Sequence, residues 1–260
     1  MKLQPRDLPD HLLSIGRHDV TTAEARELLK LDAAPAAVAL ARLRRKGQLF
    51  SPARGLYIVV PPDYRSWGVV PGEWFVDAMM RHLKRSYYVA LLTAAAFHGA
   101  SHQAPQVFRV MTDRYLANRA LGRVRLRFHV NQHVDDDPVG QMSAATGYFK
   151  ISTKETTIVD LVNHPRASGG FGNVASILKE IGGLDGSVLA RIASRRGRAL
   201  TRRVGWLVEH FGQANDLEAL RQAARVELGE PALLDPSSTR RGRADLTWSI
   251  RVNADVEPDT

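Results

Sequence analysis

Five cationic side chains stand close together in the first quarter of the chain. They are Arg42, Arg44, Arg45, Lys46 and Arg54. No Asp or Glu occurs between Asp32 and Asp63, so no nearby acid neutralises them. Cations concentrated in this way suit the phosphates of a nucleic acid, which supply most of the sequence-independent part of DNA binding. The segment therefore predicts binding to a polyanion, and double-stranded DNA first.

Helices would have to position most of these cations. Thr21 or Thr22 suits the N-cap of a helix over 23–30, with Glu24 or Ala25 near its third position. After a turn at 31–32, a further helix is expected to begin near Pro35, because proline fits the first helical position. Gly47 is expected to end that helix.

The second of these helices has two different faces. Ala36, Ala39, Leu40 and Leu43 have the spacing of a buried stripe. The opposite side carries small residues and cations, namely Ala37, Val38, Ala41, Arg44 and Arg45. Small side chains there would let the helix enter a groove deeply.

A hairpin is expected next, with strands over 49–51 and 56–60 around an Arg-Gly turn. Together with a first helix over 9–15, these elements predict a winged helix-turn-helix, with the third helix in the major groove and the hairpin on the flanking backbone. The predicted DNA-binding residues are Thr22, Arg42, Arg44, Arg45, Lys46, Ser51 and Arg54. Which bases they read does not follow from the sequence, since any of the cations can hold phosphate instead.

The rest of the chain predicts a larger mixed α+β domain with a small sheet. A Pro/Gly-rich connection over 61–72 is the expected boundary, giving domains at 1–65 and 72–260. Helices are expected over 73–84, 87–98, 154–163, 171–181, 186–196, 199–211 and 216–228, and strands over 107–111, 123–130, 148–151 and 246–252. Ser152 with Glu155 is expected to form a capping box for the helix over 154–163.

The composition is that of a globular protein that favours anionic partners. The 260 residues carry a formal net charge of +9, 44% of them are apolar, and none is Cys. The balance favours nucleic acid or another anionic surface, and disulfides and thiolate metal sites are excluded. The N-terminus lacks the apolar core of a signal peptide, and the apolar run over 87–97 is shorter than the roughly 20 residues of a membrane span. We expect a soluble cytoplasmic protein.

Catalytic and metal sites are weakly indicated. Asp135–Asp137 could hold a divalent cation, although a solvated acidic turn is the simpler interpretation. His98, His102, His129 and His133 lack a metal-binding spacing. Gly169–Gly172 lacks the Lys-Ser or Lys-Thr of a phosphate loop, and Asp160 is expected to pair with a basic residue within the fold. We therefore predict no enzyme activity, no metal and no cofactor.

Two further basic clusters admit more than one interpretation. One is Arg123, Arg125 and Arg127 on a strand face, and the other is Arg195, Arg196, Arg198, Arg202 and Arg203 at a helix junction. Either could extend a DNA footprint or bind a toxin or RNA. The alternative is a solvated surface or internal salt bridges. Arg123, Arg125, Arg127, Arg202 and Arg203 are retained as a predicted second basic surface.

Four stretches in order resemble the AbiEi family of antitoxins from type IV toxin–antitoxin and abortive-infection systems. They are YYVALLTAAAFHGASHQAP, ISTKETTIVDLVNHP, GGFGNVASILKEI and RRVGWLVEHFG, beginning at residues 87, 151, 169 and 202. The second carries Glu155, Thr157 and Asp160 in family-like places, and the fourth carries Arg202, Arg203, Gly205 and Glu209. The resemblance departs at Thr156, where the family pattern has an Arg.

The resemblance implies a repressor that binds inverted repeats in its own promoter and counters a nucleotidyltransferase-type toxin, without the need for a stable complex. Two alternatives stay open from the residues. One is a winged-helix regulator with a ligand-sensing second domain and no toxin. The other is an enzyme on nucleic acid that the first domain targets.

Overall fold

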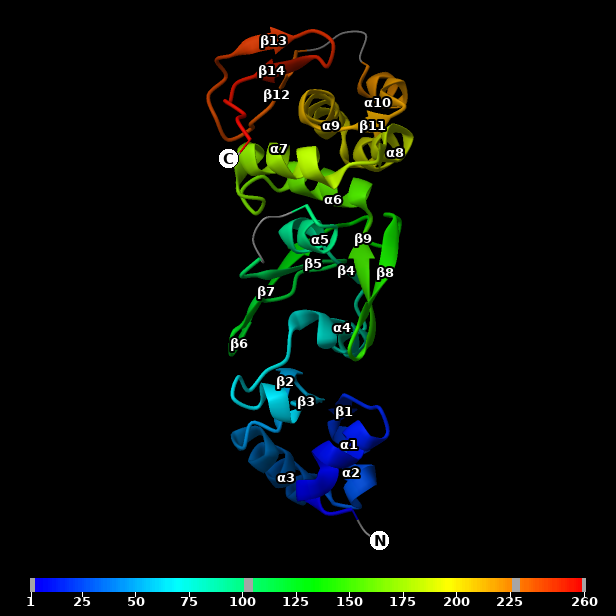
Figure 1. The fold of residues 1–260 in the computed structure, drawn as a ribbon, viewed down its shortest axis with the longest axis vertical. Helices are drawn as coiled ribbons and strands as arrows, with labels where there is room; N and C mark the ends of the chain where they lie inside the picture. Colours follow the sequence, from blue (N-terminus) through cyan, green and yellow to red (C-terminus); the bar gives the residue numbers. More distant parts are fainter. Residues whose placement is uncertain (1–2, 101–104, 226–229, 259–260) are drawn as a thin grey trace. The chain divides into compact units, whose positions relative to one another are not determined.

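The computed structural model describes residues 3–100, 105–225 and 230–258 (Figure 1). The chain divides into two compact units, each made of several segments. The first comprises residues 1–88, 106–135 and 141–150, and the second comprises 89–105, 136–140 and 151–260. Helices and strands occur in both units, which confirms the predicted mixed α+β class.

The N-terminal part of the first unit packs three helices beside a three-stranded sheet. Its elements are α1 (Leu8–Ser14), β1 (Asp19–Thr21), α2 (Thr22–Leu29), α3 (Ala33–Arg45), β2 (Leu49–Ala53) and β3 (Leu56–Val59). The strands lie in the order β1-β3-β2, and both pairings are antiparallel. The helices bury Leu12, Leu29 and Leu40 together in one apolar core. The strand β1 was not anticipated, because three residues are too few for an alternating pattern.

The start of α2 is fixed by a capping box. The Thr21 hydroxyl accepts a hydrogen bond from the backbone N–H of Glu24 at 3.2 Å, and the Glu24 carboxylate accepts one from the Thr21 N–H at 2.7 Å. These bonds satisfy backbone donors that have no partner within the helix. The predicted cap is therefore confirmed at Thr21.

The helix α3 begins two residues earlier than predicted. Its first residue is Ala33, so Pro35 lies inside the first turn. Proline is tolerated there because the N–H groups of the first turn have no intrahelical acceptor. The predicted buried stripe is confirmed at Ala36, Ala39, Leu40 and Leu43. Gly47, with φ of +66°, follows the end of the helix as expected.

A six-stranded sheet follows in the chain. Its strands are β4 (Tyr87–Val89), β5 (Phe108–Thr112), β6 (Arg119–Leu121), β7 (Val124–Val130), β8 (Val139–Ala144) and β9 (Gly147–Ser152). They lie in the order β6-β7-β5-β4-β9-β8. Before the sheet come the short helices at Pro62–Tyr64 and Gly72–Trp74 and α4 (Val76–Leu83). The helix predicted over 73–84 is thus a short helical turn followed by α4.

The prediction of one buried helix over 87–98 was wrong. Residues Tyr87–Val89 form the strand β4, and the helix α5 covers only Leu91–Phe97. Ala90 between them has an extended backbone, with φ of −139° and ψ of 177°, so no helix runs through it. A short apolar run is compatible with a buried strand and with a buried helix, and periodicity does not separate the two.

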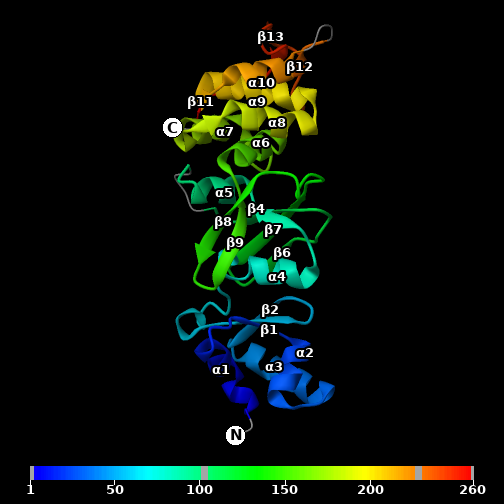
Figure 2. The same ribbon diagram turned by 90° about the vertical axis from the view of Figure 1, so that its right-hand side faces the viewer.

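The second unit is dominated by helices that pack against one another (Figure 2). They are α6 (Lys154–Asn163), α7 (Gly170–Ile181), α8 (Gly186–Arg196), α9 (Arg198–Phe211) and α10 (Leu217–Ala224). The bounds of α6, α7, α8 and α9 agree with prediction to within one residue. The helix predicted over 216–228 begins as expected, but 226–229 lie outside the described residues.

Small strands complete the second unit. The strands β10 (Leu184–Asp185) and β11 (Ala214–Asn215) form a parallel pair, and β12 (Ala232–Leu233), β14 (Ile250–Val252) and β13 (Arg243–Asp245) form a three-stranded sheet. The strand predicted over 246–252 is shorter than expected, because a turn precedes Ile250.

The cap of α6 also differs from prediction. Thr153 is the N-cap, and its hydroxyl accepts a hydrogen bond from the Thr156 N–H at 3.3 Å. Glu155 instead accepts a hydrogen bond from the Asp185 N–H at 3.3 Å. The predicted capping box of Ser152 with Glu155 is therefore absent.

Candidate nucleic-acid interface

The helix α3 presents one continuous exposed stripe along its length. The stripe consists of Ala34, Ala37, Val38, Ala41, Arg42 and Arg45, all of them exposed. These positions repeat at three- and four-residue spacing, so they lie on one helix face, opposite the buried stripe. The first two turns of the stripe are apolar and its end is cationic.

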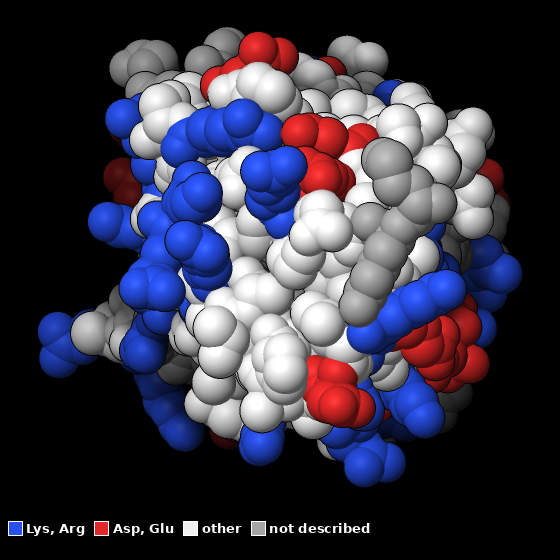
Figure 3. Space-filling model, turned by 90° about the horizontal axis from the view of Figure 1, so that it is seen from below, with Lys and Arg blue, Asp and Glu red and all other residues white. Residues whose placement is uncertain are grey.

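The cations at the end of α3 are accessible. Arg42, Arg44, Arg45 and Lys46 are all exposed, and none of them forms an ion pair with a described residue. Figure 3 looks onto the N-terminal end of the chain, where Lys and Arg gather along one side of a broad uncharged area. Exposed cations without acidic partners keep their full charge available for a polyanion.

The β2–β3 hairpin is held at its turn. Gly55, with φ of +83°, accepts a hydrogen bond from the Thr22 N–H at 2.9 Å. The carbonyl of Arg54 lies 2.9 Å from Nε2 of His82 on α4. The Arg54 side chain itself is exposed. The turn is thus fixed by its backbone while the guanidinium is left accessible.

Two of the predicted DNA-binding hydroxyls have local partners. Ser51 donates a hydrogen bond to the Ala53 carbonyl at 2.8 Å, and Thr22 donates to the Gly55 carbonyl at 3.4 Å. Both bonds shape the hairpin and its junction with α2. The accessible cations, rather than these hydroxyls, are the stronger candidates for phosphate contact.

Arg125 and Arg127 on β7, with Arg123 in the turn just before it, form a second accessible basic surface. Arg123, Arg125 and Arg127 are exposed, and the Arg123 guanidinium lies 5.1 Å from the ring centre of Trp67. On the neighbouring strand β5, Arg109 is paired in register with Arg127. Burial, and then the charge of Arg127, lower the pKa of Arg109. Arg109 and Arg127 therefore lie side by side on neighbouring strands of the sheet.

Arg202 and Arg203 do not belong to that surface, and this part of the predicted set needs correction. Arg202 is 6% exposed, and its guanidinium donates to the carbonyls of Ala224 and Ser249 at 3.4 and 3.3 Å. Arg203 donates to the Leu233 carbonyl at 2.7 Å. Both guanidinium groups are occupied with backbone carbonyls, so they hold later segments of the chain against α9.

The other family-like residues of α9 serve the same packing. Glu209 accepts a hydrogen bond from the indole N–H of Trp248 at 2.5 Å. At Gly205, an added Cβ would overlap the ring of Trp248. This segment of the resemblance therefore corresponds to the attachment of the C-terminal strands.

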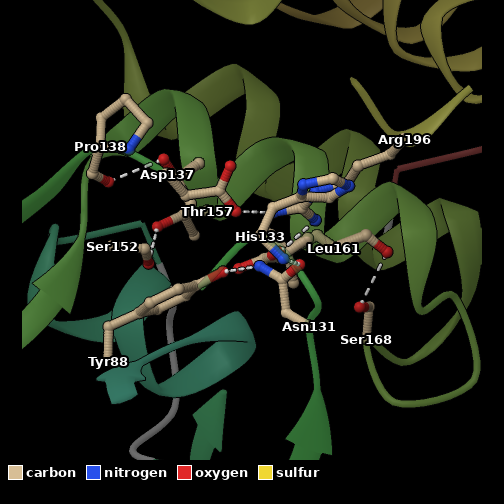
Figure 4. Close-up of polar contacts among 12 residues, drawn as sticks. Tyr88, Asn131, His133, Asp137, Pro138, Ser152, Thr157, Leu161, Ser168 and Arg196 are labelled. Carbon is tan, nitrogen blue, oxygen red and sulfur yellow. Dashed lines mark hydrogen bonds and ion pairs between the residues drawn. The ribbon is translucent and has the colours of Figure 1, made fainter. Parts of the chain in front are cut away.

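A buried ion-pair group lies between the 136–140 segment, α6 and α8 (Figure 4). Arg196 pairs with Asp137, and at 2.5 Å with Asp160. The two carboxylates are completely buried and the Arg196 side chain is 6% exposed. The predicted partner of Asp160 is thus found. The prediction for Asp137 was wrong, because this residue lies neither in a solvated turn nor where a metal ion could reach it.

The second family-like stretch also has structural partners. Thr157 donates to the Thr153 carbonyl at 2.7 Å and lies 2.7 Å from the Ser152 hydroxyl (Figure 4). Thr156, which stands where the family pattern has an Arg, is buried and donates to the Pro138 carbonyl at 2.8 Å. These contacts stabilise the start of α6.

The described residues contain no grouping of three or more His, Asp or Glu that could hold a metal ion. His102, one of the four weighed histidines, lies outside the described residues. No helix in the described ranges has both the length and the apolarity needed to cross a membrane.

Comparison with known proteins finds a matching family model and a similar solved structure. Residues 88–210 match the family model of the AbiEi antitoxin C-terminal domain, in agreement with the resemblance of the motifs. No curated protein matches the chain significantly. The chain is similar to the crystal structure of the RV2827C protein from Mycobacterium tuberculosis, with a TM-score of 0.65 and 14% identity over 94% of this chain and 89% of the other. At that identity, the likeness concerns the fold alone.

Proposed function

We propose that this chain, whose residues 88–210 match the AbiEi antitoxin C-terminal domain, neutralises a toxin of a type IV system and represses its own operon by binding DNA. In this proposal residues 1–65 bind the DNA and residues 72–260 supply the antitoxin activity. The partner toxin is of the nucleotidyltransferase type, and neutralisation requires no stable complex with it. The protein acts in the cytoplasm without a cofactor and is not itself an enzyme.

The DNA-binding part of the proposal rests on α3. The order α1, β1, α2, α3, β2, β3 and the sheet order β1-β3-β2 support the proposed winged helix-turn-helix. In such units the second helix of the helix-turn-helix enters the major groove. The observation that carries the proposal is the exposed face of α3, which ends in cations that have no acidic partner among the described residues.

Repression would follow from occupancy of the promoter. Two protomers would fill the half-sites of an inverted repeat, because the symmetry of the repeat matches that of two identical proteins. The cations at the end of α3 and Arg54 would neutralise phosphates. Bound protein would then exclude the polymerase from the promoter.

The test is a salt-titrated binding assay on the DNA upstream of the protein's own gene. Wild type is compared with Arg44→Ala/Arg45→Ala, with Arg54→Ala, and with Arg166→Ala as a control at an exposed arginine of the second unit. If all five cations meet phosphate, log K falls against log salt with a slope of roughly −4 to −5 per protomer. The double variant is expected to reduce the slope by roughly 2, and the control to leave it unchanged. Equal binding of wild type to operator and scrambled DNA would remove the repressor role.

A further inference from the structure

We propose that the first two turns of α3 read the operator through thymine 5-methyl groups, while the cations at the end of the helix hold phosphates. This proposal rests on the proposed DNA-binding function and specifies the kind of base contact that it uses. The half-site is therefore expected to present thymines to the apolar part of the exposed stripe, near Val38.

The chemistry of the helix excludes most other base contacts at these positions. From Ala33 to Ala41 every side chain is Ala, Pro, Val or Leu, so none has a hydrogen-bond donor or acceptor. In the major groove, adenine, guanine and cytosine are distinguished by donors and acceptors, whereas thymine also offers a methyl group. Because the N-terminal residues of a recognition helix contact the base edges, these apolar side chains are suited to that methyl group.

Val38 is placed to make such a contact. It is 67% exposed, which is high for a valine on a helix whose other face is fully packed. Beside it the surface is hollowed by a groove of about 950 Å³, lined by Leu31, Ala34, Pro35, Val38 and Arg42. An apolar group from a partner can therefore approach Val38 without displacing other residues. The neighbouring alanines are small enough to let the helix backbone come close to the base edges.

The surrounding charge selects DNA as the occupant of this face. Arg6, Arg42 and Lys46 border the same groove. Arg45 continues the exposed stripe beyond Arg42. An apolar strip flanked by cations is complementary to a major groove, where base methyl groups lie between two phosphate backbones. A protein partner or a second copy of this chain on the same face is the alternative that the experiment must separate.

The experiment uses the full-length protein and operator duplexes in which single thymines are replaced by deoxyuridine, which lacks only the 5-methyl group. At the thymines that face Val38, each replacement is expected to weaken specific binding about fourfold, as for the loss of one buried methyl group. Val38→Ala is expected to weaken binding to the thymine duplex by a similar factor, but to have little effect on the matching deoxyuridine duplex. Its salt slope should equal that of wild type, because no phosphate contact is removed.

Val139→Ala serves as the matched control, since Val139 is 40% exposed and lies on β8. Specific binding that is indifferent to every deoxyuridine replacement and to Val38→Ala would overturn methyl recognition and leave the repressor role intact. Absence of specific binding by wild type would overturn both. A concentration-dependent dimer in the absence of DNA that Val38→Ala dissociates would assign the face to self-association, and the proposal would fail.

Discussion

At the scale of single residues, the group Asp137–Arg196–Asp160 supports the strongest prediction of stability. Both carboxylates are completely buried beside one guanidinium. Arg196→Leu removes that cation from beside the two buried carboxylates. We expect a loss of about 3–5 kcal/mol in the free energy of unfolding, the cost of breaking a buried ion pair by removing one partner. Urea unfolding at pH 7, followed by circular dichroism, measures it.

Arg191→Leu is the control for this prediction, because Arg191 is exposed on the same helix. It should change the unfolding free energy by less than about 1 kcal/mol. An equal effect of both substitutions would mean that the ion pairs of Arg196 contribute no more than a surface charge does.

The capping residue Glu24 gives a prediction on pH. Burial raises its pKa, but hydrogen bonds from Thr21 and the Arg17 guanidinium outweigh that effect and hold the pKa below its ordinary value of 4.5. The resulting stabilisation is complete above pH 4.5 and is lost as the pH falls through the lowered folded-state pKa. Hydrogen exchange of the α2 amides should therefore show less protection at low pH in wild type. Glu24→Gln should reduce this dependence, and an unchanged dependence would exclude Glu24 as its source.

At the scale of elements, the attachment of the C-terminal strands to α9 depends on a close approach at Gly205. A methyl group there would overlap the Trp248 ring. We expect Gly205→Ala to displace Trp248 and to destabilise the second unit by about 1–3 kcal/mol through overpacking. The fluorescence of Trp248 should change because its indole also loses its hydrogen bond to Glu209. Ala199→Gly, at an exposed position of the same helix, is the control, and an unaltered emission spectrum in Gly205→Ala would contradict the packing argument.

The elements also indicate how far the sequence predicts this fold. Helices with a clear stripe or cap, such as α3 and α8, are predicted to within two residues, because their periodicity and caps are local signals. The strand β4 was mistaken for helix because its apolar residues are followed at once by those of α5. Contacts between residues far apart in the sequence were not predicted. The sequence predicts Arg202 as a surface cation, but its guanidinium donates to the carbonyls of Ala224 and Ser249, which come 22 and 47 residues later. In the candidate interface, the α3 cations and their exposure were predicted, while the anchoring of the hairpin turn by His82 was not.

At the scale of the whole molecule, the proposed division of labour predicts that repression and toxin neutralisation can be separated. The α3 cations lie in the first compact unit, and Arg202, Arg203 and Glu209 lie in the second. Arg42→Ala/Arg44→Ala/Arg45→Ala should abolish operator binding, because it removes three phosphate contacts. The same variant should still rescue growth of cells that express the toxin, since the second unit is untouched. Growth rescue and operator binding are measured on the same full-length variants, with protein levels matched by immunoblot.

A substitution in the second unit tests the same separation of activities from the other direction. Gly205→Ala alters the second unit alone, so it is expected to reduce growth rescue while wild-type operator affinity is retained. If the α3 variant instead lost both activities at normal protein level, DNA binding would be part of neutralisation. In that case the antitoxin would act on its toxin through control of expression, and residues 72–260 would not be sufficient for antitoxin activity.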